Sequence, residues 1–235
     1  MIKLINSLQN EKIKNYAKLN EKKYRDESNL FIAEGLHLVE EAKKYGIVKE
    51  ILTTNPNIDG TLVSEEVMKK LTNQKSVVEA CAICEKLNKT EITNKILILD
   101  TIQDPGNIGT LIRSAISFGF DTIVMEACAD IYSSKVLRAT QGAIFKLNII
   151  NAKIDTFINS LKGYKIYGTS LKNGVGLKTI EKTDKLAIIL GNEGNGVRSE
   201  LLEMTDENIF IEITNMESLN VGVAGGILMY ELGGK

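Results

Sequence analysis

The second half of the chain alternates apolar runs with amphipathic stretches. Five short runs have the nearly continuous apolar character of strands buried on both faces of a parallel sheet. They are ILILD (96–100), DTIVM (121–125), YKIYGTS (164–170), LAIILG (186–191) and NIFIEI (208–213). Apolar residues recur at helical spacing in the intervening NIGTLIRSAISFG, SSKVLRATQGA, IDTFINSLKG and VRSELLEM. This alternation predicts a doubly wound α/β domain with a parallel sheet.

The first part of the chain has a similar but shorter pattern. Helical spacing runs from Leu8 to about Asp26, and strands are expected in LFIAEG, VKEILTT and SVVEACAI. LHLVEEAKKYG predicts a helix closed by Gly46, and SEEVMKKLT predicts one capped by Ser64. We therefore predict a small α/β domain at residues 1–90, a polar linker at 91–95 and the larger domain at 96–235.

The C-terminal stretch ESLNVGVAGGILMYELGGK (217–235) predicts a helix from Val221 to Leu232. Its glycines at 222, 225 and 226 each weaken an ordinary helix by about 1 kcal/mol relative to alanine. Something must therefore approach that backbone closely. A packing partner, a ligand or a crossing chain would each explain the glycines.

Composition narrows the class of protein. The 235 residues are 43% hydrophobic and 25% charged, as in soluble globular proteins, and no run approaches eighteen apolar residues. We expect a cytoplasmic protein with neither signal peptide nor membrane anchor. The net charge of −1 argues against indiscriminate nucleic-acid binding. Residues 1–27 nevertheless hold seven basic and four acidic groups, which suits either a solvated amphipathic helix or contact with a phosphate backbone.

Cysteine and histidine usage argues against two kinds of chemistry. Cys81 and Cys84 form a C-x-x-C inside a strand-like stretch, where positions three apart point to opposite faces. Together with Cys128 they fit buried thiols in a reducing compartment. With no second C-x-x-C and His37 as the single histidine, we expect no zinc site and no Ser-His-Asp hydrolase.

Ligands of doubly wound sheets bind beyond the carboxyl ends of the strands, so functional groups are expected in the loops that follow them, and three of these loops are rich in polar groups or glycine. In DTIQDPGNIGTLIRSAISFG (100–119), Pro105 and Gly106 predict a turn and Asn107 a helix N-cap. Arg113 follows in an otherwise apolar helix, as either a surface cation or a functional group.

The other two loops lie at 189–200 and 217–220. ILGNEGNGVRSE sets glycines around Glu193 without the spacing of a P-loop or a dinucleotide site, so it is either a flexible turn or bare backbone for a ligand. Ser218 and Asn220 precede the last helix and are either capping or functional residues.

Together the segments DPGNIGTLIRSAISFG, ILGNEGNGV and ESLNVGVAGGILMYE resemble the SpoU (TrmH-like) group of the SPOUT methyltransferases. Members of this group transfer a methyl group from S-adenosylmethionine to a ribose 2′-hydroxyl in RNA. FIAEGLHLVEEAKKYG is similar to the start of their small L30e-like substrate-binding domain.

The resemblance implies further features. The family threads its C-terminal segment into a deep trefoil knot, in which a glycine-bearing helix packs tightly, and forms a homodimer through the knotted domain. The residues implied to contact S-adenosylmethionine are Leu190, Gly191, Gly196, Ile211, Met216, Ser218 and Leu219. Those implied to form the polar active site are Asn107, Arg113, Glu193, Ser218 and Asn220. The third segment departs from the family pattern, with Glu212 where proline is common.

The implied reaction suits these residue types. The donor's sulfonium charge disappears as the methyl group leaves, so an apolar pocket without a strong anion is adequate, and no metal is required. A guanidinium is effectively always protonated, so Arg113 is expected to bind the adjacent phosphate and stabilise alkoxide charge rather than act as a base. Asn107 and Glu193 would hold Arg113 and the ribose in line.

Three alternatives differ in target or class. Large-subunit (23S) ribosomal RNA is favoured over tRNA because of the N-terminal domain. A catalytically silent RNA-binding protein would lack methyl transfer. A nicotinamide oxidoreductase would need G-x-G-x-x-G after the first strand, and ILILDTIQDPGNIG does not contain it.

Overall fold

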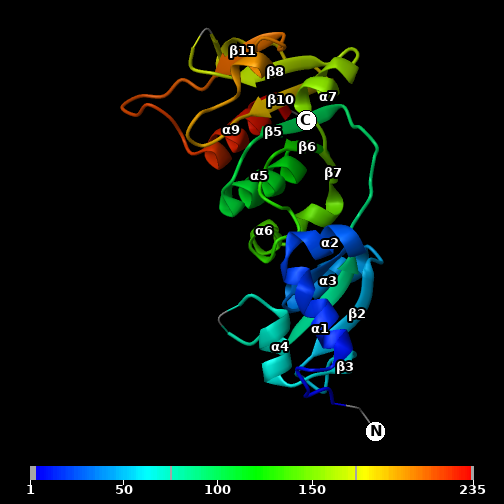
Figure 1. Cartoon of the computed structure of the whole chain (residues 1–235). Coiled ribbons are helices and arrows are strands. Elements are labelled where there is room, and N and C mark those ends of the chain that lie inside the picture. The colour runs from blue at the N-terminus through cyan, green and yellow to red at the C-terminus, as the bar shows by residue number, and fades with distance from the viewer. Residues whose placement is uncertain (1–3, 75, 173, 234–235) are drawn as a thin grey trace. The chain divides into compact units, whose positions relative to one another are not determined.

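The computed structural model describes residues 4–74, 76–172 and 174–233. The chain forms two compact units (Figure 1). Unit 1 consists of Met1–Leu87 and Asp130–Phe145, and unit 2 of Asn88–Ala129 and Lys146–Lys235.

Unit 1 is built on a four-stranded sheet in the order β1-β4-β2-β3. The strands are β1 (Leu30–Glu34), β2 (Val48–Thr53), β3 (Thr61–Leu62) and β4 (Ala80–Glu85), with β4 antiparallel to both β1 and β2. The helices are α1 (Glu11–Ala17), α2 (Lys22–Ser28), α3 (Leu36–Lys44), α4 (Glu65–Leu71) and α6 (Ser134–Thr140). The predicted Ser64 cap is confirmed, because its side chain accepts a hydrogen bond from the Val67 N–H.

The helix predicted from Leu8 to Asp26 is in fact two helices. The Asn10 side chain accepts from the N–H groups of Lys12 and Ile13 and so starts α1 at Glu11. A 3-10 turn at Lys18–Asn20 then separates α1 from α2. The Asn20 side chain donates to the Leu71 carbonyl at 3.3 Å, a tertiary contact that the helical pattern does not reveal.

Residues 130–145 belong to unit 1, although the sequence analysis included them in the domain at 96–235. The Arg25 Nη2 lies 2.5 Å from the Asp130 Oδ2, and the Phe31 ring packs on Tyr132 with centroids 4.8 Å apart. Phe31 and Phe145 are 6.1 Å apart by the same measure. These contacts link segments about a hundred residues apart, which hydrophobic periodicity cannot detect.

Unit 2 contains a seven-stranded, all-parallel sheet in the order β7-β6-β5-β10-β8-β11-β9. Its strands are β5 (Lys95–Asp100), β6 (Thr122–Glu126), β7 (Asn148–Asn151), β8 (Lys165–Thr169), β9 (Val175–Gly176), β10 (Leu186–Leu190) and β11 (Glu207–Phe210). Its helices are α5 (Pro105–Ser117), α7 (Ile154–Ser160), α8 (Ser199–Leu202) and α9 (Val221–Gly233). All five predicted strands are present, and the parallel α/β prediction is confirmed. The short strands β3, β7 and β9 were not predicted from the sequence.

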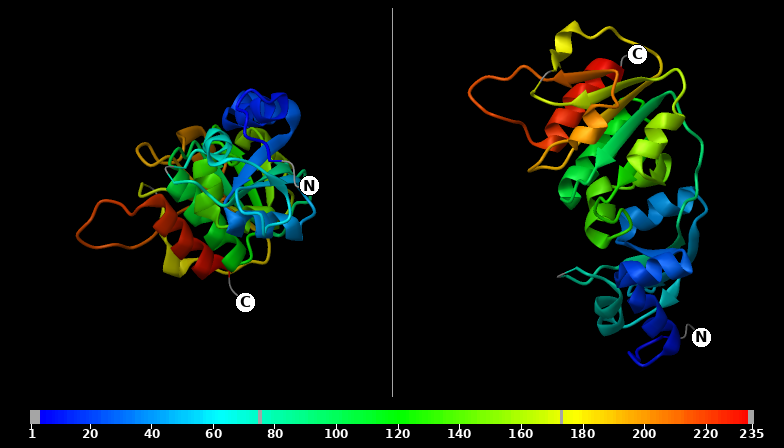
Figure 2. Two further views of the ribbon diagram at one scale, coloured as in Figure 1. Left: turned by 90° about the horizontal axis from the view of Figure 1, so that it is seen from below. Right: turned by 45° about the horizontal axis from the view of Figure 1, so that its top comes forward.

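The glycines of α9 face α5, and the two helices lie side by side (Figures 1 and 2). A Cβ on Gly225 would stand 2.2 Å from the Leu111 Cδ2 and 2.7 Å from the Leu190 Cδ1. A Cβ on Gly222 would meet Thr110 at 3.2 Å. The close neighbour inferred from the glycine run is therefore a packing partner within the same chain.

Among the described residues, no helix has both the length and the apolar character needed to cross a bilayer.

Candidate cofactor cleft and polar site

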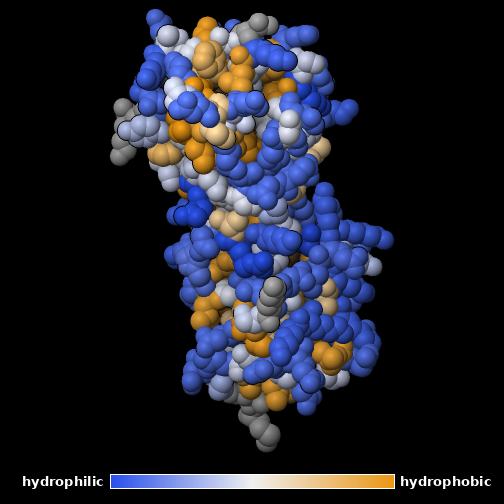
Figure 3. Space-filling view, turned by 90° about the vertical axis from the view of Figure 1, so that its left-hand side faces the viewer, coloured by the Kyte–Doolittle hydropathy of each residue, from blue (hydrophilic) through white to orange (hydrophobic). Residues whose placement is uncertain are grey.

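A cavity of about 750 Å³ opens at the carboxyl ends of β8, β10 and β11. Its walls come from the segments 169–172, 190–197, 209–211 and 218–221, with Leu202, Ile213, Ala224 and Leu228 completing them. Figure 3 shows apolar side chains exposed among polar ones on the face of unit 2 that carries the 211–220 loop. The volume is that of a site for a small organic ligand.

The cavity is apolar in its walls and nearly free of charge. Leu190, Val197, Ile209 and Leu228 line it and are almost fully buried. Lys172 and Glu193 are the only charged side chains among the described lining residues. Within the described part of the chain, residues 212–219 form no backbone–backbone hydrogen bonds, which leaves their N–H and C=O groups available to a ligand.

The loop after β10 is closed by its own backbone. Asn192 and Gly196 exchange backbone hydrogen bonds at 3.1 and 2.9 Å, and the Asn192 Oδ1 accepts from the Gly194 N–H at 2.9 Å. A Cβ on Gly191 would lie 2.1 Å from the Gly196 carbonyl carbon. Gly196 adopts a positive φ of 70°. The glycines therefore permit a compact, hydrogen-bonded loop.

A chain of hydrogen bonds joins the three predicted polar segments at the mouth of the cavity. The Asn107 Nδ2 donates to the Glu193 Oε1 at 3.0 Å, and the Asn220 Nδ2 donates to the Asn107 Oδ1 at 2.9 Å. The Asn220 Oδ1 in turn accepts from the Gly222 N–H at 2.9 Å, which caps α9. Asn220 is therefore both a capping residue and a member of the polar site.

Asn107 is not the N-cap that the sequence predicted. α5 begins at Pro105, and the Asp104 side chain caps it by accepting from the Asn107 N–H at 2.8 Å. The earlier start is favoured by proline at the first helical position, where its fixed φ suits the helix and no N–H is needed. The Asn107 side chain is thereby free to bind Glu193 and Asn220.

Glu193 is held as an anion. Burial alone would raise the pKa of its carboxyl group. Hydrogen bonds from the Asn107 amide and from the backbone N–H groups of Asp104 (3.2 Å) and Gln103 (3.4 Å) outweigh burial, so the pKa is lowered. At neutral pH the carboxylate is thus ionised and accepts hydrogen bonds.

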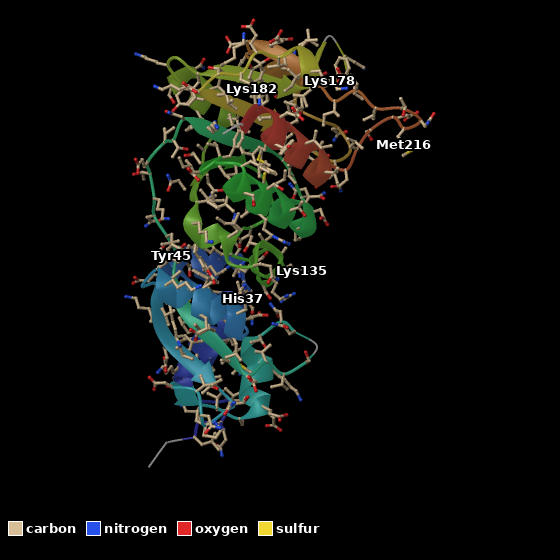
Figure 4. The ribbon with its side chains drawn as sticks, turned by 180° about the vertical axis from the view of Figure 1, so that it is seen from behind. His37, Tyr45, Lys135, Lys178, Lys182 and Met216 are labelled. Carbon is tan, nitrogen blue, oxygen red and sulfur yellow. The ribbon has the colours of Figure 1, made fainter. Side chains whose placement is uncertain are left out.

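The structure does not bring every predicted residue into this group. Arg113 is exposed on α5, and its guanidinium has no partner among the described residues. Ser218 lines the cavity but makes no side-chain hydrogen bond to the described part of the chain. Met216 is 72% exposed on the projecting 211–220 loop and is not part of the cavity wall (Figure 4).

An ion-pair network beneath the loop was not predicted from the sequence. Arg198 Nε lies 2.8 Å from the Asp100 Oδ1, and Arg198 Nη2 lies 2.7 Å from the Glu126 Oε2. Asp100 is fully buried at the end of β5, and Glu126 ends β6. The network ties the loop after β10 to the ends of β5 and β6. The acidic residue that ends the apolar run ILILD, Asp100, was the one feature of the sequence that indicated a buried charge in need of a partner.

An all-parallel sheet with an apolar cavity and a polar cluster at its carboxyl edge is the arrangement in which α/β proteins generally bind small organic ligands. The chain belongs to the SpoU rRNA Methylase family, whose family model matches residues 94–230. The model of the MRM3-like substrate binding domain matches residues 10–97. The resemblance drawn from the three segments is confirmed.

Individual relatives align with most or nearly all of the chain. The 23S rRNA (guanosine(2553)-2′-O)-methyltransferase RlmP of Bacillus subtilis (strain 168) is 39% identical over 248 aligned residues, spanning 99% of this chain and 100% of the relative. The 23S rRNA (guanosine-2′-O-)-methyltransferase RlmB of Coxiella burnetii (strain RSA 493 / Nine Mile phase I) is 31% identical over 83% of this chain and 80% of its own. The AdoMet-bound rRNA methyltransferase from Sinorhizobium meliloti superimposes with a TM-score of 0.87 at 29% identity, covering 98% of this chain and 97% of that one.

Proposed function

We propose that this protein transfers a methyl group from S-adenosylmethionine to a ribose 2′-hydroxyl of 23S ribosomal RNA. The proposed target is the guanosine equivalent to the one named for the Bacillus subtilis relative. The observation that carries the proposal is the hydrogen-bonded chain Glu193–Asn107–Asn220 at the mouth of an apolar cavity. It occurs in a chain that aligns with that relative from end to end.

The cavity suits S-adenosylmethionine. When bound, this cofactor supplies an electrophilic methyl group on a positively charged sulfur. Apolar walls fit its adenosine and need no countercharge for a sulfonium that becomes neutral in the reaction. We assign the contacts to Leu190, Gly191, Gly196, Ile211 and Leu219, largely through their backbone. Ser218 also lines the cavity, and Met216 would reach the cofactor only if the 211–220 loop folded inward.

The polar residues prepare the ribose hydroxyl. The lowered pKa of Glu193 makes it a weak base, so its role is to orient the Asn107 amide. Asn107 and Asn220 position the ribose, with Ser218 beside them on the cavity wall. Arg113, permanently charged and without a partner among the described residues, binds the adjacent phosphate and stabilises negative charge on the attacking oxygen.

We propose a homodimer through the knotted C-terminal domain, with Val223 (50% exposed) and Tyr230 (64% exposed) of α9 in the interface. A trefoil knot formed by residues of unit 2 would account for the tight glycine packing of α9 on α5. Unit 1 serves as the L30e-like RNA-binding domain, and the protein acts in the cytoplasm.

Two measurements test the function. Calorimetry with S-adenosylhomocysteine should show one site per chain. The protein should transfer the labelled methyl group of S-adenosylmethionine to a 23S rRNA transcript but not to bulk tRNA. Mapping 2′-O-methyl groups in cells with and without the protein identifies the nucleotide. Methylation of tRNA alone would move the target to tRNA. Cofactor binding without methylation of either RNA would favour a silent RNA-binding protein.

A further inference from the structure

A pair of cations lies in unit 1, on a segment that the sequence assigns to the other domain. Arg138 and Lys135 both lie on α6, three residues apart and hence on one face of the helix. Figure 4 labels Lys135 on α6 and His37 on α3. The His37 Nε2 lies 3.2 Å from the Gln141 carbonyl oxygen at the end of α6.

Arg138 is held in place by a buried carboxylate. Its Nη1 lies 2.9 Å from the Oε2 of Glu34, whose side chain is only 1% exposed, and it also bonds the Ser134 hydroxyl. The other carboxylate oxygen of Glu34 accepts from the Asn73 N–H at 3.0 Å. With both oxygens of Glu34 engaged, the guanidinium has a fixed position.

The rest of the guanidinium faces outward. The Arg138 side chain is 35% exposed, and its Nε and Nη2 have no partner among the described residues. A guanidinium fixed at one nitrogen and open along the Nε–Nη2 edge is prepared for bidentate binding of an oxyanion.

The surrounding charge favours an anion. Lys135 is exposed and has no side-chain partner in the described part of the chain. Glu34 is neutralised by Arg138, and the α3 carboxylates Glu40 and Glu41 pair with Lys43 and Lys44. Lys135 therefore leaves an uncompensated positive charge on the same face of α6 as Arg138.

We infer that Arg138 and Lys135 form a phosphate-binding site for the RNA backbone, with Glu34 as the residue that positions Arg138. The inference rests on the proposed function for the identity of the anion as an RNA phosphate. It makes α6, which the chain supplies between β6 and β7, part of the substrate-recognition surface of unit 1.

The test uses the full-length protein, a 23S rRNA transcript and the salt dependence of binding. The plot of log K against log salt has a negative slope, and each lost phosphate contact makes that slope shallower by about 0.7–0.9. Lys135→Ala should show this loss and bind RNA about five- to eightfold more weakly at 0.1 M salt. Lys69→Ala is the matched control, because Lys69 is exposed on α4 and also lacks a side-chain partner among the described residues.

A double variant tests Arg138 without changing net charge. Glu34→Gln with Arg138→Gln replaces the ion pair by a neutral hydrogen bond, so a reduced salt slope would report a specific lost contact. The thermal midpoint and the affinity for S-adenosylhomocysteine should stay near those of the wild type. If the double variant does not fold, the comparison of Lys135→Ala with Lys69→Ala still tests whether the phosphate site exists.

The outcomes separate this site from the proposed function. Wild-type slopes and affinities in both altered proteins would overturn the site, as would an equal loss in Lys69→Ala. Methylation by the wild type in that case would leave the proposed function intact. RNA binding through the site without methylation would overturn the function and support the site.

Discussion

Asn107 uses both ends of its side-chain amide, and no other residue type of its size can replace it. Its nitrogen donates to Glu193 and its oxygen accepts from Asn220. Asn107→Asp would lose the donor and set a second carboxylate against Glu193, where like charges repel. We expect methyl transfer to fall by at least tenfold, measured as kcat/KM on the rRNA transcript. Wild-type activity in this variant would show that the hydrogen-bonded chain is dispensable.

Arg113 separates chemistry from cofactor binding. Arg113→Ala should leave the affinity for S-adenosylhomocysteine nearly unchanged, because Arg113 does not line the cavity. Methyl transfer should fall by two or more orders of magnitude, since a lost charge-stabilising group typically costs about 2.7–4 kcal/mol of transition-state stabilisation. Single-turnover rates measure the second effect. Full activity would disprove the assigned role while leaving the family assignment intact.

The lowered pKa of Glu193 predicts how the polar site responds to acid. A carboxylate whose pKa is lower in the folded protein stabilises the fold above its ordinary value of 4.5, and this contribution disappears as the pH falls through the folded pKa. The difference in free energy of unfolding between wild type and Glu193→Gln should thus be constant from pH 7 to about 5 and shrink below 4. Urea unfolding at several pH values measures it. A difference that grows on acidification would contradict the assignment.

At the scale of elements, the contact of α9 with α5 depends on individual glycines. Gly225→Ala would press a Cβ into the buried Leu111 and Leu190, so we expect a loss of about 1–3 kcal/mol in the free energy of unfolding. Weaker binding of S-adenosylhomocysteine should accompany it, because Leu190 lines the cavity.

Gly226→Ala is the matched control in the same helix. A Cβ there would find its nearest neighbour, the Ser114 Oγ, at an ordinary 3.6 Å. Alanine's better helix propensity should therefore stabilise the protein by up to about 1 kcal/mol. Equal effects of the two substitutions in urea unfolding would refute the packing argument.

Elements with a strong local pattern were predictable, and those defined by distant contacts were not. The run LAIILG predicted β10, because a continuous apolar run can be recognised from neighbouring residues alone. In contrast, β9 has only two residues and is defined by its pairing with β11. Glu193, Asn107 and Asn220 were predicted as one polar site from three matching segments. Gly191 was assigned a ligand contact, but the sequence could not show that the Gly196 backbone occupies the space of its missing Cβ.

At the scale of the molecule, unit 1 cannot be removed by cutting the chain once. A fragment of residues 88–235 would retain 130–145, including Val136, Leu137 and Phe145, which are almost fully buried in the intact protein. We expect this fragment to aggregate or to bind a hydrophobic dye, because it exposes an apolar patch. Light scattering and dye fluorescence measure the effect.

The control fragment replaces residues 130–145 with a Gly/Ser linker of equal length. It should stay monodisperse at the same concentration and bind S-adenosylhomocysteine. If the unaltered 88–235 fragment is equally monodisperse and binds no dye, then the apolar side chains of residues 130–145 do not need the rest of unit 1 to be buried.

The interleaving of the two units also sets an order of events during synthesis. When Leu87 leaves the ribosome, β1 still lacks α6, and Phe31 lacks the rings of Tyr132 and Phe145 that cover it in the finished protein. Roughly 60 more residues must be made first, which takes about 3–12 s at 5–20 residues per second. Unit 1 is thus N-terminal by sequence, yet it completes its fold only after the first two strands of unit 2 have been translated.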